Sequence, residues 1–253
     1  MKKYRNFLVA LIGLLGFLLP NISGAQTKTN NNDVWFHYVG KNMLTKKISF
    51  TLEATMRYAN GLSEKQQYFI RPSFDYQFTK KFNGSIGYSH YSTYMYGSLA
   101  LNKTAIPEDH IWIQGTFVHT KGNYKFTHRV RDENRFVGIA VKNGTEYSID
   151  HYEYRNRLRY MFLMNYTLTK KEDKVKLFGI VGNEAFFNMG SNAGKTFFNQ
   201  NRIIGGLGYN LDSHNQIQLS YIHQNIWSFS NTLHESNPTI RLSYITNLDF
   251  IKK

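Results

Sequence analysis

Several long stretches of the chain alternate between apolar and polar residues. The alternation is clearest in residues 48–58 and recurs in 68–78, 152–168 and 240–250. Side chains of a β-strand point alternately to its two faces, so each stretch predicts a strand with one apolar and one polar face. The polar faces carry many arginines, which a soluble two-sheet protein could bury only at a high energetic cost. A membrane barrel avoids that cost, because its apolar face meets lipid and its polar face meets water.

Weaker alternation elsewhere raises the number of predicted strands to ten. The additional strands cover roughly residues 82–94, 110–120, 124–138, 175–188, 199–209 and 216–227. Short connections at 80–81, 121–123, 171–174 and 212–215 alternate with longer ones at 59–66, 95–109, 139–150, 189–198 and 228–237. Outer-membrane barrels have short periplasmic turns and longer external loops. We therefore predict an all-β fold, a single antiparallel transmembrane β-barrel of 10 to 12 strands.

Residues 34–39 form a further short stretch that the ten strands do not account for. Either this stretch is a partial strand or inner segment, or it has an unrecognised partner and the barrel contains twelve strands. With an even number of strands, both chain ends lie on the side of the short turns. We therefore predict that the N- and C-termini are periplasmic.

The first 25 residues predict a cleaved signal peptide. A basic N-terminus precedes an apolar run at 7–19 that Pro20 ends, which is too short to span a bilayer as a helix. Small residues up to Ala25 suit cleavage after that position. Residues 26–33 are polar and predict a flexible leader, so the barrel domain is predicted to occupy 34–253.

Composition supports export to the cell outer membrane. Aromatic residues make up 16% of the chain, and it contains no cysteine. Aromatic girdles are typical of membrane barrels, whereas small secreted domains usually rely on disulfides. The formal charge of +14 could favour nucleic acid, a lipid surface or anionic ligands, but export argues against nucleic acid.

The final predicted strand reaches an aromatic residue, Phe250, close to the C-terminus. This ending is similar to the signal that the barrel-assembly machinery recognises. The expected partners are therefore outer-membrane lipid, that machinery during biogenesis and, as a candidate, a small anionic ligand.

Short charged and polar motifs lie within the predicted strands. They are the segments 128–136, 183–186 and 199–202, the arginines Arg155, Arg157 and Arg159, and the residues Trp112 and Gln114. In these motifs the chain resembles a family of Gram-negative envelope barrels known as domain of unknown function 2490. The resemblance extends over most of the chain after the signal peptide. It implies a barrel in the outer membrane and supplies no activity.

The polar faces of the predicted strands place ten arginines and six acids in the interior, an excess of four positive charges. The predicted lumen charge network comprises Glu53, Arg57, Arg71, Asp75, Arg129, Arg131, Glu133, Arg135, Glu153, Arg155, Arg157, Arg159, Glu184, Arg202 and Arg241, and Asp249 is the sixth acid. In a narrow barrel such side chains can meet across the lumen and form bidentate ion pairs.

Two functions fit an interior of this kind. The first is an Arg/Glu network that fills the lumen, in a barrel with a structural or binding role, because buried charges persist mainly when they are paired. The second is a narrow anion-preferring channel, because guanidinium groups bind carboxylate and phosphate well.

A third function, a surface lipid hydrolase, requires a serine, a histidine and a polar orienting group together on the lipid-facing side. Ser89 with His90, and Ser220 with His223, offer the residue types, but strand alternation directs the members of each pair to opposite faces. We therefore predict no catalytic residue and no enzymatic activity.

Histidines provide no pattern that indicates a metal site. His37, His110 and His214 are expected singly, in loops or at the membrane interface. Zinc sites in proteins usually combine several such ligands at short spacing. The sequence therefore predicts neither a metal nor a cofactor.

Overall fold

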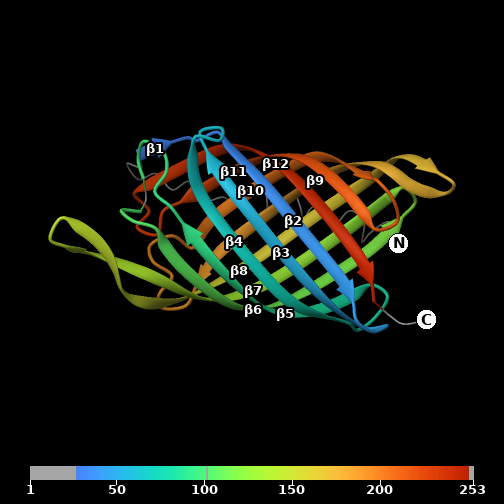
Figure 1. Ribbon diagram of the computed structural model, residues 1–253, viewed down its shortest axis with the longest axis horizontal. Coiled ribbons are helices and arrows are strands. Elements are labelled where there is room, and N and C mark those ends of the chain that lie inside the picture. The colour runs from blue at the N-terminus through green and yellow to red at the C-terminus, as the bar shows by residue number, and fades with distance from the viewer. Residues whose placement is uncertain (1–26, 101, 251–253) are drawn as a thin grey trace, which may run out of the picture.

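The computed structural model describes residues 27–100 and 102–250, and its regular elements are β-strands (Figure 1). They are β1 (Thr27–Thr29), β2 (Asp33–Met43), β3 (Ile48–Ala59), β4 (Glu64–Gln77), β5 (Phe82–Thr93), β6 (Ile106–Lys121), β7 (Tyr124–Asn143), β8 (Glu146–Lys171), β9 (Lys174–Met189), β10 (Phe198–Asn210), β11 (Asn215–Trp227) and β12 (Leu233–Asp249). Consecutive strands from β2 to β12 pair with each other, and β2 also pairs with β12. These strands therefore close a barrel of eleven strands, which confirms the predicted fold class. The predicted signal peptide lies outside the described residues.

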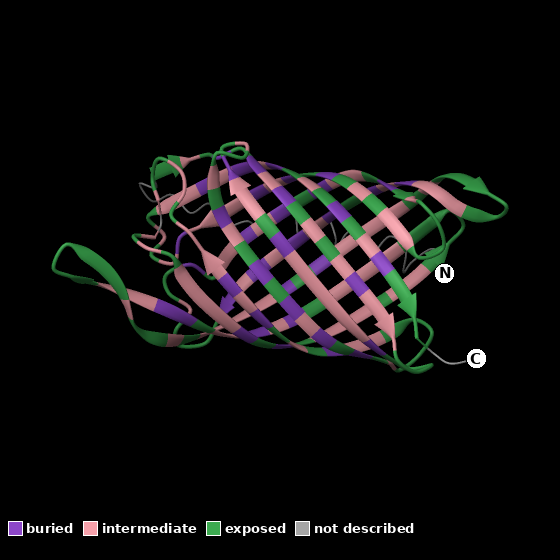
Figure 2. Ribbon diagram, viewed as in Figure 1, coloured by how far each residue is buried: buried purple, intermediate pink, exposed green. Residues whose placement is uncertain are grey.

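Burial alternates along the strands, as the sequence pattern requires (Figure 2). Leu207, Leu219 and Leu242 are neighbours on β10, β11 and β12 and lie on the outer surface, where 44–56% of each is exposed. Ser220 follows Leu219 in the chain and is almost fully buried, facing the interior. The outer surface is thus apolar and the interior is largely polar. Among the described residues, no helix is long and apolar enough to cross a membrane.

The barrel closes through one parallel pair of strands. In this seam β2 runs beside β12 in the same direction, from Asp33 opposite Thr239 to Met43 opposite Asp249. The other neighbouring pairs between β2 and β12 are antiparallel. Residues 34–39 therefore belong to a full strand rather than to a partial strand or an inner segment.

An odd number of strands separates the two ends of the described chain. One rim, the turn rim, carries the connections 44–47, 78–81, 122–123, 172–173 and 211–214, and the opposite loop rim carries 60–63, 94–105, 144–145, 190–197 and 228–232. The chain enters β2 at the loop rim and leaves β12 at the turn rim (Figure 1). The prediction that both ends lie on one side is therefore wrong for the described residues. The error arose because β2 has only a short apolar stretch, which hid a complete strand.

The predicted flexible leader also contains ordered pairing. Within residues 26–33, Thr27–Thr29 form β1, which pairs in parallel with β12 from Leu233 to Glu235. This pairing depends on backbone hydrogen bonds. Because the side chains of the segment are polar, they show no apolar–polar alternation that would have predicted a strand.

Two of the predicted long loops are largely strand. β7 and β8 continue as a hairpin that projects beyond the loop rim, so most of 139–150 is paired (Figure 1). Likewise β6 begins at Ile106, inside the predicted loop 95–109. This earlier start adds Glu108 to the residues that face the interior.

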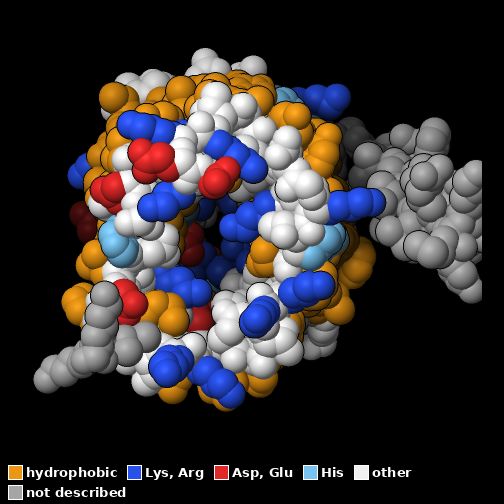
Figure 3. Space-filling model, turned by 90° about the vertical axis from the view of Figure 1, so that its right-hand side faces the viewer, with side chains coloured by type: hydrophobic (Ala, Val, Ile, Leu, Met, Phe, Trp, Pro, Cys, Tyr) orange, Lys and Arg blue, Asp and Glu red, His pale blue; other side chains and the backbone are white. Residues whose placement is uncertain are grey.

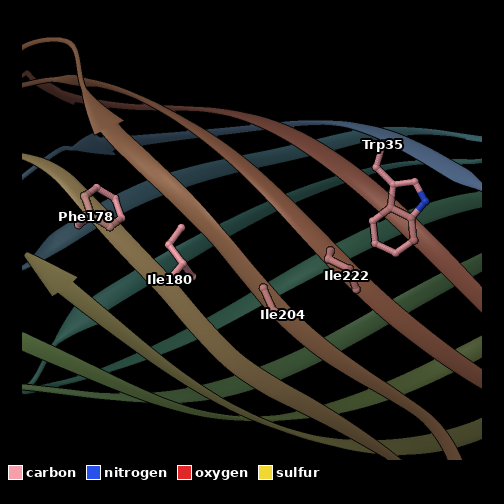
Figure 4. Packing of buried hydrophobic residues seen from close by; sticks show 5 residues of the cluster. All are labelled: Trp35, Phe178, Ile180, Ile204 and Ile222. Carbon is pink, nitrogen blue, oxygen red and sulfur yellow. The ribbon is translucent and has the colours of Figure 1, made fainter. Parts of the chain in front are cut away.

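The interior also contains an apolar patch. Phe178 and Ile180 on β9, Ile204 on β10 and Ile222 on β11 lie on one wall, with Trp35 of β2 in the same cluster (Figure 4). All five are almost fully buried. The polar part of the lumen is therefore bounded by an apolar wall on β9, β10 and β11.

Candidate functional site

Glu133 is the most buried carboxylate of the lumen. Its Oε2 atom accepts hydrogen bonds from Nε and Nη2 of Arg157, at 2.8 and 2.6 Å, and its Oε1 atom accepts one from Nη1 of Arg159 at 2.6 Å. Nη1 of Arg131 lies 3.7 Å from Oε1. Because Glu133 faces Arg157 in the β7–β8 register, the two-residue period of both strands brings these charges together.

Glu184 on β9 continues the same network. Its Oε1 atom accepts hydrogen bonds from Nη2 of Arg129 at 2.6 Å and from Nη2 of Arg159 at 2.6 Å. Nη1 of Arg202 lies 3.3 Å from its Oε2 atom. Arg159 therefore bridges Glu133 and Glu184 across three neighbouring strands.

Two further carboxylates bind Arg71 and Arg135. Nη1 of Arg71 donates to Glu53 Oε2 at 2.7 Å, and Arg135 donates to Glu108. Each carboxylate also contacts a histidine that faces the lumen: His37 Nε2 lies 3.2 Å from Glu53 Oε1, and His110 Nε2 lies 2.5 Å from Glu108 Oε1.

Sequence reasoning missed Glu108 and misplaced two histidines. His37 and His110 were expected in loops or at the interface, but both point into the lumen from strands, whereas His214 lies in the connection 211–214. Extending the two-residue period upstream from Trp112 through His110 to Glu108 would have identified this part of the site.

Three predicted network residues lie apart from these ion pairs. Asp75 accepts hydrogen bonds from the hydroxyls of Ser49, Thr51 and Ser85 at 3.2, 2.6 and 2.5 Å. Near the loop rim, Glu153 pairs with Arg155 at 3.1 Å. The predicted charges therefore form several separate groups rather than one continuous network.

Arginine exceeds carboxylate in the central cavity of the lumen, which has a volume of about 430 Å³. Its walls include eight arginines and three glutamates: Arg57, Arg71, Arg129, Arg135, Arg157, Arg159, Arg202 and Arg241 with Glu53, Glu108 and Glu184. Among the described residues, no carboxylate oxygen lies within 4.0 Å of Arg57 or Arg241. A guanidinium group that lines a cavity without an acidic partner attracts anions.

The connection between β5 and β6 reaches into the cavity from the loop rim. Tyr96 of this connection lines the cavity and donates a hydrogen bond to Glu235 Oε2 at 3.0 Å. Burial and the neighbouring Glu235 carboxylate raise the pKa of Tyr96 well above its usual range, so the hydroxyl remains a donor. Asn237 donates to the same oxygen at 2.9 Å, and its own Oδ1 accepts from the backbone N–H of Asn31.

The turn rim is hollowed at its centre, and basic and acidic side chains are visible inside the hollow (Figure 3). A second cavity of about 390 Å³ lies at this rim, beside the turns at 122–123 and 172–173. The two rims therefore differ: Tyr96 lines the cavity at the loop rim, whereas the turn rim is hollowed.

The serine and histidine pairs considered for hydrolysis do not come together. Ser89 is buried in the lumen, where its Oγ accepts from Arg71 Nε at 2.9 Å, whereas His90 contacts Asp109 on the outer surface. Ser220 also faces inward, away from His223. Within 27–100 and 102–250, no group of three or more His, Asp or Glu side chains could hold a metal ion.

The outer surface nevertheless carries another serine–histidine contact. His223 Nε2 lies 3.2 Å from Ser236 Oγ, and His223 Nδ1 lies 3.4 Å from the hydroxyl of Tyr221. The β11–β12 pairing creates this contact between residues 13 positions apart. Sequence reasoning missed it because it considered only serines close to a histidine in the chain.

Comparison with known proteins identifies the family. Residues 32–235 match the family described as "Protein of unknown function (DUF2490)". Among solved structures, the chain is similar to a NanC porin in a rhombohedral crystal form, with 9% identity, a TM-score of 0.41 and coverage of 80% of this chain and 93% of that chain. No curated protein matches the sequence. Since the family match covers most of the chain, this barrel belongs to the DUF2490 family of proteins of unknown function.

Proposed function

We propose that this chain is an outer-membrane β-barrel that binds small anions in its lumen. The apolar outer surface and the closed hydrogen-bond ladder support the membrane location, because a bilayer accepts only structures whose backbone groups are satisfied internally. Short turns are periplasmic in such barrels, so the turn rim faces the periplasm and the loop rim faces outward. The described N-terminal end then lies outside and the C-terminal end lies in the periplasm.

The excess of arginine in the central cavity carries the proposal. Eight arginines line the cavity and share four carboxylates, Glu53, Glu108, Glu184 and the adjacent Glu133, so positive charge remains after every ion pair is formed. A network whose only task is to brace the wall has no need of that excess, since unpaired buried charges destabilise a fold. A bound anion supplies the missing negative charge. The paired arginines thus brace the wall and the remaining ones attract the ligand.

Calorimetric titration of the refolded barrel in detergent tests this function. Inorganic phosphate and acetate serve as anionic probes, and tetramethylammonium serves as the cationic control. We expect saturable binding of the anions and none of the cation, with weaker binding as the salt concentration rises. Equal binding of anion and cation, or no saturable binding of any anion, would refute the proposal.

Conduction is a further property that the same lumen could support. Tyr96 lines the cavity at the loop rim, where its hydroxyl donates to Glu235, so a through path requires the 94–105 connection to move. In a planar bilayer we therefore expect little steady conductance from the intact barrel. Replacing Tyr96 by alanine should increase conductance, with a reversal potential that shows preference for anions. Large, unselective currents from the intact barrel would contradict the covered lumen.

Lipid hydrolysis is the second candidate function, and one observation favours it. On the outer surface, near the start of β12 at the loop rim, His223 contacts both the hydroxyl of Ser236 and the hydroxyl of Tyr221. A hydroxyl, an imidazole and an orienting group are the parts of a nucleophilic centre. Release of fatty acid from phospholipid vesicles, lost in Ser236→Ala, would establish this activity. If the barrel releases no fatty acid, the contact is structural and the anion-binding role stands alone.

A further inference from the structure

The seam of the barrel brings together two arginines that lack acidic partners. The register places Arg241 of β12 beside Trp35 of β2, and Trp35 beside Arg57 of β3. All three side chains line the central cavity. The two arginines therefore flank Trp35 at the same level of the barrel, on the strands either side of β2.

The side-chain contacts of Arg57 are with uncharged groups, so they do not neutralise its positive charge. Its guanidinium carbon lies 4.1 Å from the centre of the Trp35 ring, and Nη1 donates to the neutral amide of Gln67 at 2.6 Å. A second cation, Arg202, lies 5.0 Å from the centre of the same ring. Arg202 has Glu184 as a partner, whereas no described carboxylate lies within ion-pair distance of Arg57. Arg57 and Arg202 thus both lie against the Trp35 ring, and only Arg202 has an acidic partner among the described residues, Glu184.

Arg241 and its neighbours add further unsatisfied groups to the same wall. Nε of Arg241, Nε of Arg57 and the hydroxyl of Thr55 are buried without a hydrogen-bond partner among the described residues. The hydroxyl of Ser220, which lies opposite Arg241 on β11, is also buried without a hydrogen-bond partner among the described residues. A buried donor without an acceptor destabilises the fold. Several such donors on one wall therefore indicate a binding site for a ligand that supplies the acceptors.

We propose that this seam is a subsite for a small organic dicarboxylate, with one carboxylate on Arg57 and the other on Arg241; this inference rests on the anion-binding function proposed above. Strands two apart in a sheet are roughly 10 Å apart, and long arginine side chains reduce the span, which suits a dicarboxylate of roughly four to six carbons. The planar guanidinium fork matches a carboxylate through two hydrogen bonds. A monocarboxylate or a single phosphate is too short to contact both arginines at once.

Titration of the refolded, full-length barrel with succinate, acetate and inorganic phosphate tests the subsite. We expect succinate to bind at least about tenfold more tightly than acetate or phosphate, since it gains a second charge-assisted contact. Arg57→Gln and Arg241→Gln should each lower succinate affinity by at least about tenfold and leave acetate affinity within about threefold. Arg155→Gln is the matched control, because Arg155 pairs with Glu153 outside the cavity and its loss should leave succinate affinity unchanged.

The outcomes separate this subsite from the general function. If all three anions bind the wild-type barrel with similar affinity, the anion-binding lumen holds and the dicarboxylate subsite is wrong. If none binds, the proposed function itself fails. The heat-dependent shift in gel mobility verifies that each variant is folded, and the comparison of succinate with acetate on the wild-type barrel decides the matter even where a variant is unfolded. Equal loss of succinate affinity in Arg155→Gln would also overturn the assignment.

Discussion

Individual charged residues in the lumen differ in what they contribute, although the same chemistry recurs along the strands. Glu133 is fully buried and accepts three hydrogen bonds from two arginines, so its carboxylate offsets buried positive charge that water does not reach. Glu153 has the same functional group, but it pairs only with Arg155 close to the loop rim, where about a third of its side chain is exposed. Burial therefore decides which ion pairs stabilise the barrel.

Replacing Glu133 by glutamine should destabilise the barrel strongly. The amide cannot neutralise Arg157 and Arg159, so we expect the free energy of unfolding to fall by about 3–5 kcal/mol. Urea unfolding in lipid vesicles, followed by tryptophan fluorescence, measures this change. The control Glu153→Gln should cost less than about 1 kcal/mol because water solvates that pair. Similar losses for both variants would show that the two pairs are equally screened.

At the scale of strands, the outer surface and the seam are stabilised by different interactions. Leu207, Leu219 and Leu242 form part of an apolar band on three neighbouring strands, which only lipid can cover in an isolated barrel. The seam instead depends on backbone pairing in one direction, from Asp33 to Met43 along β12. The apolar band and the seam can therefore be tested separately.

Leu219→Arg should destabilise the barrel in a bilayer. An arginine near the middle of the apolar band must leave water, so we expect a loss of about 2–4 kcal/mol in urea unfolding from lipid vesicles. Leu62 lies in the connection between β3 and β4 and is equally exposed, so Leu62→Arg should change stability by no more than about 0.5 kcal/mol. If Leu219→Arg is as harmless as Leu62→Arg, the band does not face lipid.

The parallel seam predicts a specific cross-link. Phe36 and Leu242 are directly opposite in the β2–β12 register, and the chain contains no cysteine of its own. The double variant Phe36→Cys with Leu242→Cys should therefore oxidise to a disulfide within the barrel, since neighbouring strands lie within disulfide reach. Met56 lies one strand further away, opposite Phe36, so Met56→Cys with Leu242→Cys should remain reduced. Mass spectrometry after oxidation distinguishes the two, and a disulfide only in the second pair would place β2 elsewhere.

The whole molecule is asymmetric between its rims. The β7–β8 hairpin projects from the loop rim and Tyr96 covers the lumen there, whereas the turn rim is hollow (Figures 1 and 3). This difference between the rims follows from the arrangement of the connections and not from any single residue.

Surface labelling of intact cells tests the proposed orientation. Thr145 lies in the exposed tip of the β7–β8 hairpin, and Asn123 lies in the exposed turn between β6 and β7. We expect Thr145→Cys to react with a membrane-impermeant maleimide in intact cells, because the proposed orientation directs the loop rim outward. Asn123→Cys should react only after the outer membrane is permeabilised. The reverse pattern would mean that the turn rim faces outward.

The sequence alone determined most of the strands and the facing of most of their side chains, because a two-residue period is a local property of the backbone. It therefore predicted the barrel and placed Glu133, Arg157, Arg159 and Glu184 in one interior. Pairing between distant segments was decided only by the tertiary structure. The parallel seam, the pairing of Glu108 with Arg135 and the isolation of Asp75 among hydroxyls all depend on which strands become neighbours and at what register. Alternation specifies a face for each side chain, but the partner it meets there is set by closure of the barrel, which joins residues far apart in the chain.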